Sequence, residues 1–262
     1  SFLNVLIDRL PRGESIRGRS YCENCNTPLL PWELIPIFSF LFLRGKCRKC
    51  GGNIPVRIPV VEFLTGMGFV VLFWFTTDSF RFMADFRGWD FWLQYTAHGV
   101  LLSSFIVLFF ADLEYGVLPD SVILPVSAAT LVWRLLDLRR LLTNSRGLPP
   151  FSTFSNAFLF HILPALGLAA FFMLIILVTK GRGMGFGDVK LGFLIGLVLG
   201  WPGTLVAAFL GFLFGAVVSV ILLISGRKKF GQTIPFGPFL VAGTAVAALY
   251  GEVVWSAYVQ LL

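Results

Sequence analysis

Four cysteines near the start of the chain form two closely spaced pairs. They are Cys22 and Cys25, then Cys47 and Cys50, with 21 residues between the two CxxC motifs. Four thiolates at this spacing can surround zinc as a tetrahedron, which is a structural site with no open position. Neighbouring Lys46, Arg48 and Lys49 would favour the thiolate form. Free thiols and two disulfides remain as alternatives, although disulfides are rare in the cytoplasm.

A second group of candidate residues consists of acids at the ends of apolar runs. Asp112 ends the run SSFIVLFFAD, and Asp188 ends the glycine-rich stretch GMGFGD before another apolar run. Two carboxyl groups brought together share a proton, because both cannot easily ionise. The ionised one could activate water while the protonated one polarises a peptide carbonyl, which is aspartic-protease chemistry. The alternative for each acid is a helix cap or a solvated boundary residue, and for Asp120 and Glu114 that is the simpler interpretation.

The elements that carry these residues are predicted to be membrane helices. The 262 residues are 56% hydrophobic and 13% charged, whereas soluble domains carry about 25% charged residues. This composition excludes an ordinary soluble fold and disorder. Apolar runs long enough to cross a bilayer predict seven spans, near 57–76, 91–111, 117–137, 157–179, 189–201, 203–225 and 236–262.

Two further features concern how these spans begin and pack. The opening segment 1–7 looks like the end of another span, so we predict an all-α polytopic protein of seven spans here and eight with a missing N-terminal helix. The stretch 200–203 predicts a tight turn, and PFGP at 235–238 should break a helix near the candidate active site. Small residues are predicted to allow close helix packing, namely Gly196, Gly200, Gly211 and Gly215.

Positive charge is distributed unevenly between the two sides of the predicted membrane domain. One side carries Arg9, Arg12, Arg17, Arg19, Arg44, Lys46, Arg48, Lys49, Arg57, Lys180, Arg182, Lys190, Arg227, Lys228 and Lys229. The other side carries Arg81, Arg87, Arg134, Arg139, Arg140 and Arg146. The excess predicts that 8–56 is a small cysteine-rich cytoplasmic domain and 57–262 the membrane domain. A nucleic-acid partner is not expected, because the basic residues scatter over several loops instead of forming one face.

The whole chain resembles the type IV prepilin peptidases, which combine leader peptidase and N-methyltransferase activities. Seven stretches carry the resemblance, in order along the chain: SFLNVLIDRLPRGESI (1–16), RSYCENC (19–25), PWELIPIFSFLFLRGKCRKCGG (31–52), RIPVVEFLTG (57–66), DLEYGVLPD (112–120), GMGFGDVK (183–190) and PFGPFL (235–240). The resemblance implies a multi-pass bacterial inner-membrane enzyme surrounded by lipid, with about eight spans and its active site facing the cytoplasm.

The same resemblance implies a substrate and roles for particular residues. Such enzymes cut the basic leader of prepilins and type II secretion pseudopilins after a glycine. They then methylate the new N-terminus with S-adenosylmethionine. The family's catalytic aspartates correspond to Asp112 and Asp188. Its zinc ligands correspond to Cys22, Cys25, Cys47 and Cys50, and the presence of all four favours the two-activity form.

The methyl-donor site is the least specific part of this interpretation. No GxGxxG fingerprint or βαβ pattern occurs, and the cytoplasmic segment is too short for the usual methyltransferase fold. Glu14, Arg19 and Gly45 are the candidate contacts to S-adenosylmethionine. Alternatively, the first two are surface charges and Gly45 is a turn residue.

Two other classes of protein could have this composition. A transporter would have acids near the bilayer midplane and repeated halves, whereas Asp112 and Asp188 are predicted at one boundary and no repeat is evident. A non-catalytic zinc-bearing assembly factor would explain the cysteines but would leave the two aspartates without a role.

Overall fold

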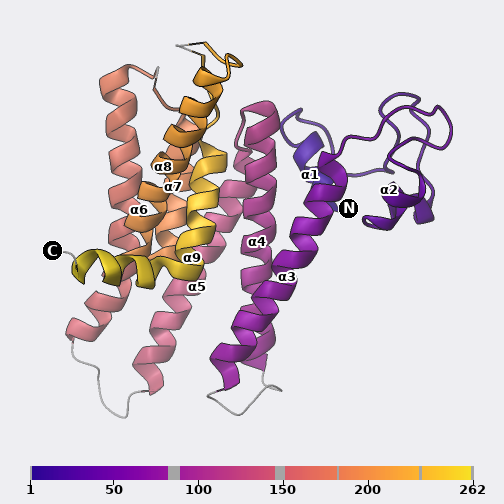
Figure 1. The fold of residues 1–262 in the computed structure, drawn as a ribbon. Helices are drawn as coiled ribbons and strands as arrows, with labels where there is room; N and C mark the ends of the chain where they lie inside the picture. The colour runs from indigo at the N-terminus through magenta and orange to yellow at the C-terminus, as the bar shows by residue number, and fades with distance from the viewer. Residues whose placement is uncertain (1, 82–88, 145–150, 182, 230–231, 261–262) are drawn as a thin grey trace. The chain divides into compact units, whose positions relative to one another are not determined.

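A computed structural model describes residues 2–81, 89–144, 151–181, 183–229 and 232–260. Its helices follow one another in the order α1 (Phe2–Arg9), η1 (Pro31–Leu34), α2 (Phe38–Phe42), α3 (Arg57–Arg81), α4 (Trp89–Tyr115), α5 (Asp120–Asn144), α6 (Phe151–Thr179), α7 (Phe186–Leu199), α8 (Gly203–Ile224) and α9 (Gly237–Gln260) (Figure 1). Arg87, Arg146 and Arg182 of the charge prediction lie outside the described residues, as do residue 1 and residues 261–262 of the predicted end segments.

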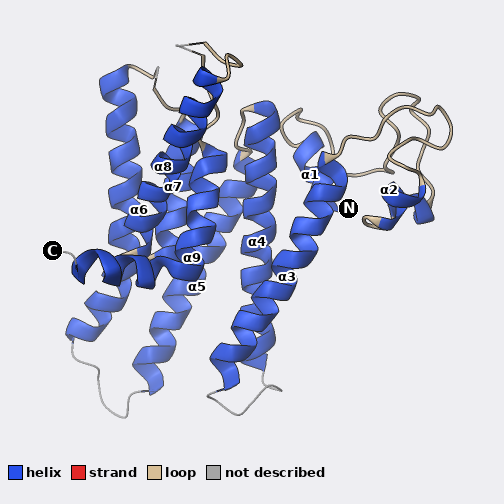
Figure 2. Cartoon of the chain, viewed as in Figure 1, coloured by secondary structure: helices blue, strands red, loops and turns tan. Residues whose placement is uncertain are grey.

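The described elements are helices joined by loops and turns, which confirms the all-α prediction (Figure 2). Within the described residues, five helical stretches are long and apolar enough to cross a membrane: Arg57–Thr76, Phe91–Tyr115, Leu159–Thr179, Gly203–Ile224 and Gly237–Gln260. Many of their large apolar side chains are exposed, because lipid rather than protein is the solvent that covers them. The chain is therefore a multi-pass membrane protein.

The other two predicted spans coincide with α5 and α7. Helix α7 has 14 residues, which at about 1.5 Å per residue is shorter than the roughly 30 Å hydrocarbon core. A count of seven or eight spans therefore stays a prediction. The predicted turn at 200–203 lies where expected, between the end of α7 and the start of α8.

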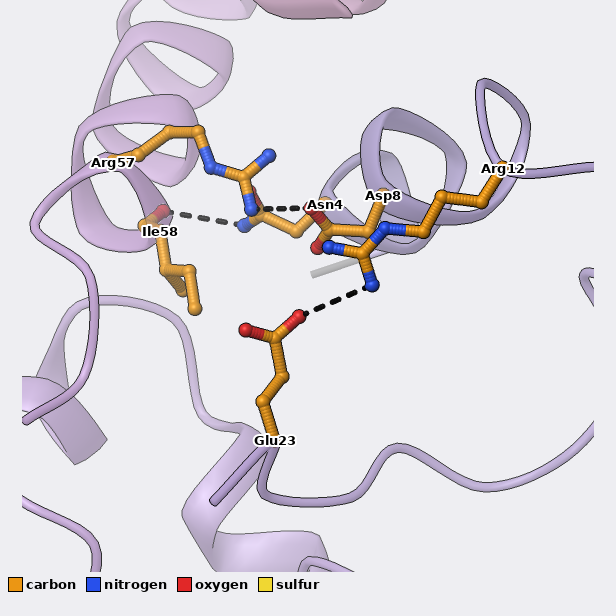
Figure 3. Close-up of polar contacts among 6 residues, drawn as sticks. All are labelled: Asn4, Asp8, Arg12, Glu23, Arg57 and Ile58. Carbon is orange, nitrogen blue, oxygen red and sulfur yellow. Dashed lines mark hydrogen bonds and ion pairs between the residues drawn. The ribbon is translucent and has the colours of Figure 1, made fainter. Parts of the chain in front are cut away.

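The chain divides into two compact units, Ser1–Val107 and Leu108–Leu262, and the division falls within α4. In the first unit, α1 is attached to the beginning of α3 (Figure 3). Asn4 donates a hydrogen bond to the Ile58 carbonyl oxygen at 3.2 Å, and Arg57 forms a 2.6 Å ion pair with Asp8. The segment that carries the cysteines leaves from this junction.

In the second unit, α7 is the central helix. It packs against α5, α6, α8 and α9, and Leu191, Leu194 and Ile195 are fully buried. The predicted close packing is confirmed at Gly196, where a Cβ would lie 2.2 Å from the Cα of Ala165 in α6. A short helix enclosed in this way holds the residues at its N-terminus in fixed positions.

Candidate active site and cysteine site

The four cysteines converge, as their spacing predicted. All four are free thiols, and their Sγ atoms lie within 4.8 Å of one another. The Sγ atoms of Cys22 and Cys50 are 3.9 Å apart. Zinc bound tetrahedrally at about 2.3 Å from each sulfur would set the sulfurs about 3.8 Å apart, so the four residues fit this metal.

The two CxxC motifs have the same backbone geometry. Cys22 N–H donates to the carbonyl of Thr27 at 3.0 Å, and Cys47 N–H donates to that of Gly52 at 2.8 Å. Asn26 and Gly51, at equivalent places in the two turns, both have left-handed backbone conformations, with φ of 54° and 68°. Asn and Gly adopt this conformation most readily. We did not predict this short repeat, although an Asn or Gly directly after each CxxC motif was visible in the sequence.

Hydrogen bonds lower the pKa values of two of the thiols. The Cys25 Sγ lies 3.4 Å from the Thr27 hydroxyl oxygen. Hydrogen bonding to Thr27, first through its side chain and then through its backbone, lowers the pKa of Cys25 to about 6. Backbone hydrogen bonds from Cys50 and Lys49 lower the pKa of Cys47. Local hydrogen bonds therefore favour the thiolate, the form that binds metal, at Cys25 and Cys47. At Cys50 a backbone hydrogen bond from Gly52 is outweighed by burial and by hydrogen bonds with the other three thiols, which raise its pKa to about 11. Thr27 is a contributor that the sequence analysis missed.

Asp112 lies near the C-terminal end of α4 with a buried carboxyl group. Its side chain is 6% exposed, and its Oδ2 atom accepts no hydrogen bond from the described residues. The backbone at the start of α9 lies directly against it, because a Cβ on Gly237 would be 2.5 Å from Oδ2. Gly237 belongs to the PFGP stretch that was predicted to break a helix near the candidate active site, and it is the first residue of α9.

Asp188 lies in the first turn of α7 and is 8% exposed. Its Oδ2 accepts a hydrogen bond from Gly185 N–H at 3.2 Å, so the carboxyl caps its own helix. Asp188 lies outside the five candidate spans. Burial, and the charge of the nearby Asp112, raise the pKa of Asp188 to about 6. The structure therefore brings the two aspartates close enough for their charges to interact. Asp188 is also a helix cap, so both interpretations of this residue hold together.

Two contacts attach the turn between α4 and α5 to the first turn of α7. The Leu118 side chain would lie 3.1 Å from a Cβ on Gly187, and Lys190 forms a 2.6 Å ion pair with Asp120, the first residue of α5. Together with the approach of Gly237 to Asp112, they gather the ends of α4, α5, α7 and α9 around the two aspartates.

The three candidate methyl-donor contacts lie in two places. Glu14 N–H donates to the carbonyl of Arg9 at 2.9 Å, and the Arg9 guanidinium donates to the carbonyl of Arg19 at 3.2 Å. Glu14 and Arg19 are thus neighbours of the same arginine. Gly45 has a φ of 69°, and a Cβ there would lie 3.1 Å from the Phe40 ring. Its turn geometry alone already favours glycine.

Comparison with known proteins assigns this arrangement to a family. The model of the bacterial peptidase A24 N-terminal domain matches residues 1–76, and that of the type IV leader peptidase family matches residues 99–220. Curated relatives match over nearly the full length of both chains. The chain belongs to the type IV leader peptidase family. The resemblance drawn from the seven motifs is therefore confirmed.

Several relatives of this leader peptidase family member carry the name prepilin leader peptidase/N-methyltransferase. The protein from Stutzerimonas stutzeri is 30% identical over 99% of this chain and 90% of its own length. The Pseudomonas aeruginosa protein is 30% identical over 99% and 89%, and that of Bacillus subtilis is 30% identical over 94% and 87%. No solved structure matches the chain. The chain is thus an enzyme whose relatives are named for a peptidase and a methyltransferase activity.

Proposed function

We propose that this protein removes the leader peptide of type IV prepilins or type II secretion pseudopilins. Cleavage would follow a glycine and use Asp112 and Asp188. The observation that carries the proposal is the burial of two interacting carboxyl groups in one compact unit of a leader peptidase family member. The transporter hypothesis has no comparable support.

The proposed reaction needs one proton on the pair of aspartates. The ionised carboxyl takes a proton from water as the water oxygen attacks the scissile carbonyl carbon, and the protonated carboxyl donates to the carbonyl oxygen. The tetrahedral intermediate then collapses. The carboxyl that took a proton from water gives it to the amide nitrogen, and a hydroxyl of the intermediate returns a proton to the other carboxylate. The C–N bond breaks, a carboxylic acid and a free amine leave, and the pair again holds one proton. No nucleophilic serine or cysteine is required.

The membrane would align the substrate with these carboxyls. A prepilin carries a basic leader followed by an apolar helix, so its scissile bond lies at the membrane boundary. Asp112 is three residues from the end of the candidate span Phe91–Tyr115, and Asp188 precedes most of α7. The excess of positive residues in the loops on this side supports a cytoplasmic active site in the inner membrane.

We assign the second activity, N-methylation of the new N-terminus, to the cysteine-rich segment 8–56. Cys22, Cys25, Cys47 and Cys50 would hold a structural zinc ion, which stabilises a segment too small for a large core. S-adenosylmethionine would supply the methyl group. Glu14 and Arg19 would contact it, with Gly45 shaping the turn before the second CxxC motif.

The test uses the purified full-length chain, a prepilin in detergent and S-adenosylmethionine with a labelled methyl group. Asp112→Asn and Asp188→Asn should each abolish leader cleavage while leaving methylation of pre-cleaved pilin intact. Glu252→Gln makes the same chemical change at an exposed position of α9 and should cleave normally. Full cleavage by either aspartate variant would exclude that residue from the mechanism. Full cleavage by both would exclude the proposed peptidase chemistry.

A further inference from the structure

The segment 31–42, between the two CxxC motifs, exposes an unusual density of large apolar side chains. It contains η1 and α2, and its side chains bury little of their surface within the protein. Phe38 is 70% exposed, Leu41 65% and Phe42 90%. The same segment also exposes Trp32, Leu34 and Ile35. Such a concentration of exposed apolar side chains marks a surface that something else covers.

One hydrogen bond places this segment relative to the membrane-spanning part of α3. The backbone N–H of Ile37 donates to Glu62 Oε2 at 2.8 Å. Glu62 lies five residues beyond Arg57, where both α3 and its candidate span begin. Five residues correspond to about 7.5 Å along a helix. Because helical side chains lean toward the N-terminus of their helix, this contact places Ile37, and α2 directly after it, beside the first turns of the candidate span.

The first turns of a spanning helix lie near the boundary between lipid headgroups and acyl chains. Interfacial helices insert their apolar faces about 5–10 Å into this boundary, and tryptophan and other aromatic residues concentrate there. Water would be an unfavourable solvent for Phe38, Leu41 and Phe42. At this level beside a spanning helix, lipid is available to replace it.

A row of cations directly after the segment indicates which lipid it meets. The exposed residues that follow are Arg44, Lys46, Arg48 and Lys49. The guanidinium of Arg48 lies 5.1 Å from the centre of the Trp32 ring, so one of these cations lies against an aromatic side chain of the segment. Basic residues beside an interfacial apolar patch attract anionic phospholipids.

We infer that 31–42 is an interfacial anchor that inserts Phe38, Leu41 and Phe42 into the leaflet where α3 begins, with the following cations on anionic headgroups. The anchor would hold both CxxC motifs against the membrane surface, because one motif precedes it and the other follows it. This inference rests on the span of α3 and the contact with Glu62. It does not depend on which peptide the protein cleaves.

The test places a photo-crosslinking amino acid, p-benzoylphenylalanine, at position 42 of the full-length protein in nanodiscs of phosphatidylcholine with phosphatidylglycerol. The matched control carries it at Ile16, which is 45% exposed in the same cysteine-rich segment. Zinc content measured for each variant verifies that the segment is folded. We expect the phospholipid adduct, measured by mass spectrometry, to be at least tenfold more abundant from position 42 than from position 16.

The lipid charge and the competing occupants are tested in the same system. Raising phosphatidylglycerol from none to about a third of the lipid should increase the adduct severalfold. The double variant Arg44→Gln/Lys49→Gln should reduce that increase to less than twofold. Equal lipid adducts from positions 42 and 16 would overturn the inference. So would a position 42 adduct formed mainly with a second copy of the chain or with added prepilin.

Discussion

Replacing Gly237 by alanine is expected to displace the Asp112 carboxyl group without unfolding the protein. The new Cβ would lie 2.5 Å from Asp112 Oδ2 and 3.1 Å from its Cγ. An ordinary carbon–oxygen contact is about 3.3–3.6 Å, so Oδ2 must move by about 0.8–1.1 Å. The carboxyl can move by rotating its side chain, whereas the backbone at the packed start of α9 cannot easily retreat.

The expected size of the effect follows from this displacement. A misplacement of about 1 Å in a catalytic group can reduce the rate about 100-fold, which corresponds to about 2.7 kcal/mol of lost transition-state stabilisation. Gly237 does not have a left-handed φ, so alanine meets no left-handed strain there. Replacing glycine by alanine also restricts the unfolded chain, which stabilises the fold by about 0.4–1 kcal/mol and offsets crowding of the new Cβ against Pro238. Leader cleavage should therefore fall about 100-fold while the melting temperature stays the same or rises.

The assay compares kcat/KM for prepilin cleavage, the melting temperature and methylation of pre-cleaved pilin in the Gly237→Ala variant and a matched control. Gly167→Ala makes the same change in α6, where a Cβ would meet nothing within 4 Å, and it should cleave at the wild-type rate. Wild-type cleavage by Gly237→Ala would refute the reasoning, because the position of Asp112 would then not matter. A large fall in its melting temperature would refute the claim that only the carboxyl moves.

Three further predictions concern the aspartate, the ion pair and the cysteines. In the folded protein the pKa of Asp188 is about 6, whereas in the unfolded chain an aspartate loses its proton above about pH 4. The folded state therefore binds more protons between these two pH values, and the free energy of unfolding falls as pH rises through this range. In Asp188→Asn the amide oxygen can still accept the hydrogen bond from Gly185 N–H. This variant should therefore have a higher melting temperature than the wild type at about pH 7.5 and the same one near pH 4. A lower melting temperature at pH 7.5 would contradict this. Lys190→Met should reduce cleavage severalfold by releasing the turn that begins α5, and the exchanged pair Asp120→Lys/Lys190→Asp should recover most of the activity. Because this ion pair is partly exposed, its loss should change the free energy of unfolding by less than about 1 kcal/mol. If the exchanged pair did not restore cleavage, a role for the ion pair in activity would be disproved. Cys22→Ser should lose the bound zinc, measured by atomic emission, and abolish methylation while leaving cleavage intact; unchanged zinc content would show that this thiol is not a ligand.

Some of the site could be predicted because its determinants are local in the chain. Each CxxC motif places two sulfurs on one turn. Only the contact between the two turns depends on the tertiary structure. The acids Asp112 and Asp188 could be identified because each interrupts an apolar run, and a charge in such a position is costly unless it has a function. The repeat of the two turns could also have been predicted, since Asn26 and Gly51 follow their motifs at the same place.

Other parts depend on contacts between residues far apart in the sequence. The turn in PFGP was predictable, but its position against Asp112 was not, because that contact depends on how α9 begins beside the end of α4. Lys190 could equally have met a lipid phosphate. Its partner Asp120 became evident only once α5 and α7 had packed together.

The sequence by itself therefore determined the solvent, the helical fold class, the four cysteines that converge and the family. Composition, the length of apolar runs and short motifs are properties of the chain that do not require knowledge of packing. The tertiary structure decided which backbone approaches each carboxyl and which part of α3 the 31–42 segment contacts. Those features rest on single contacts, Gly237 against Asp112 and Ile37 with Glu62. Such contacts form only when helices distant in the sequence pack side by side.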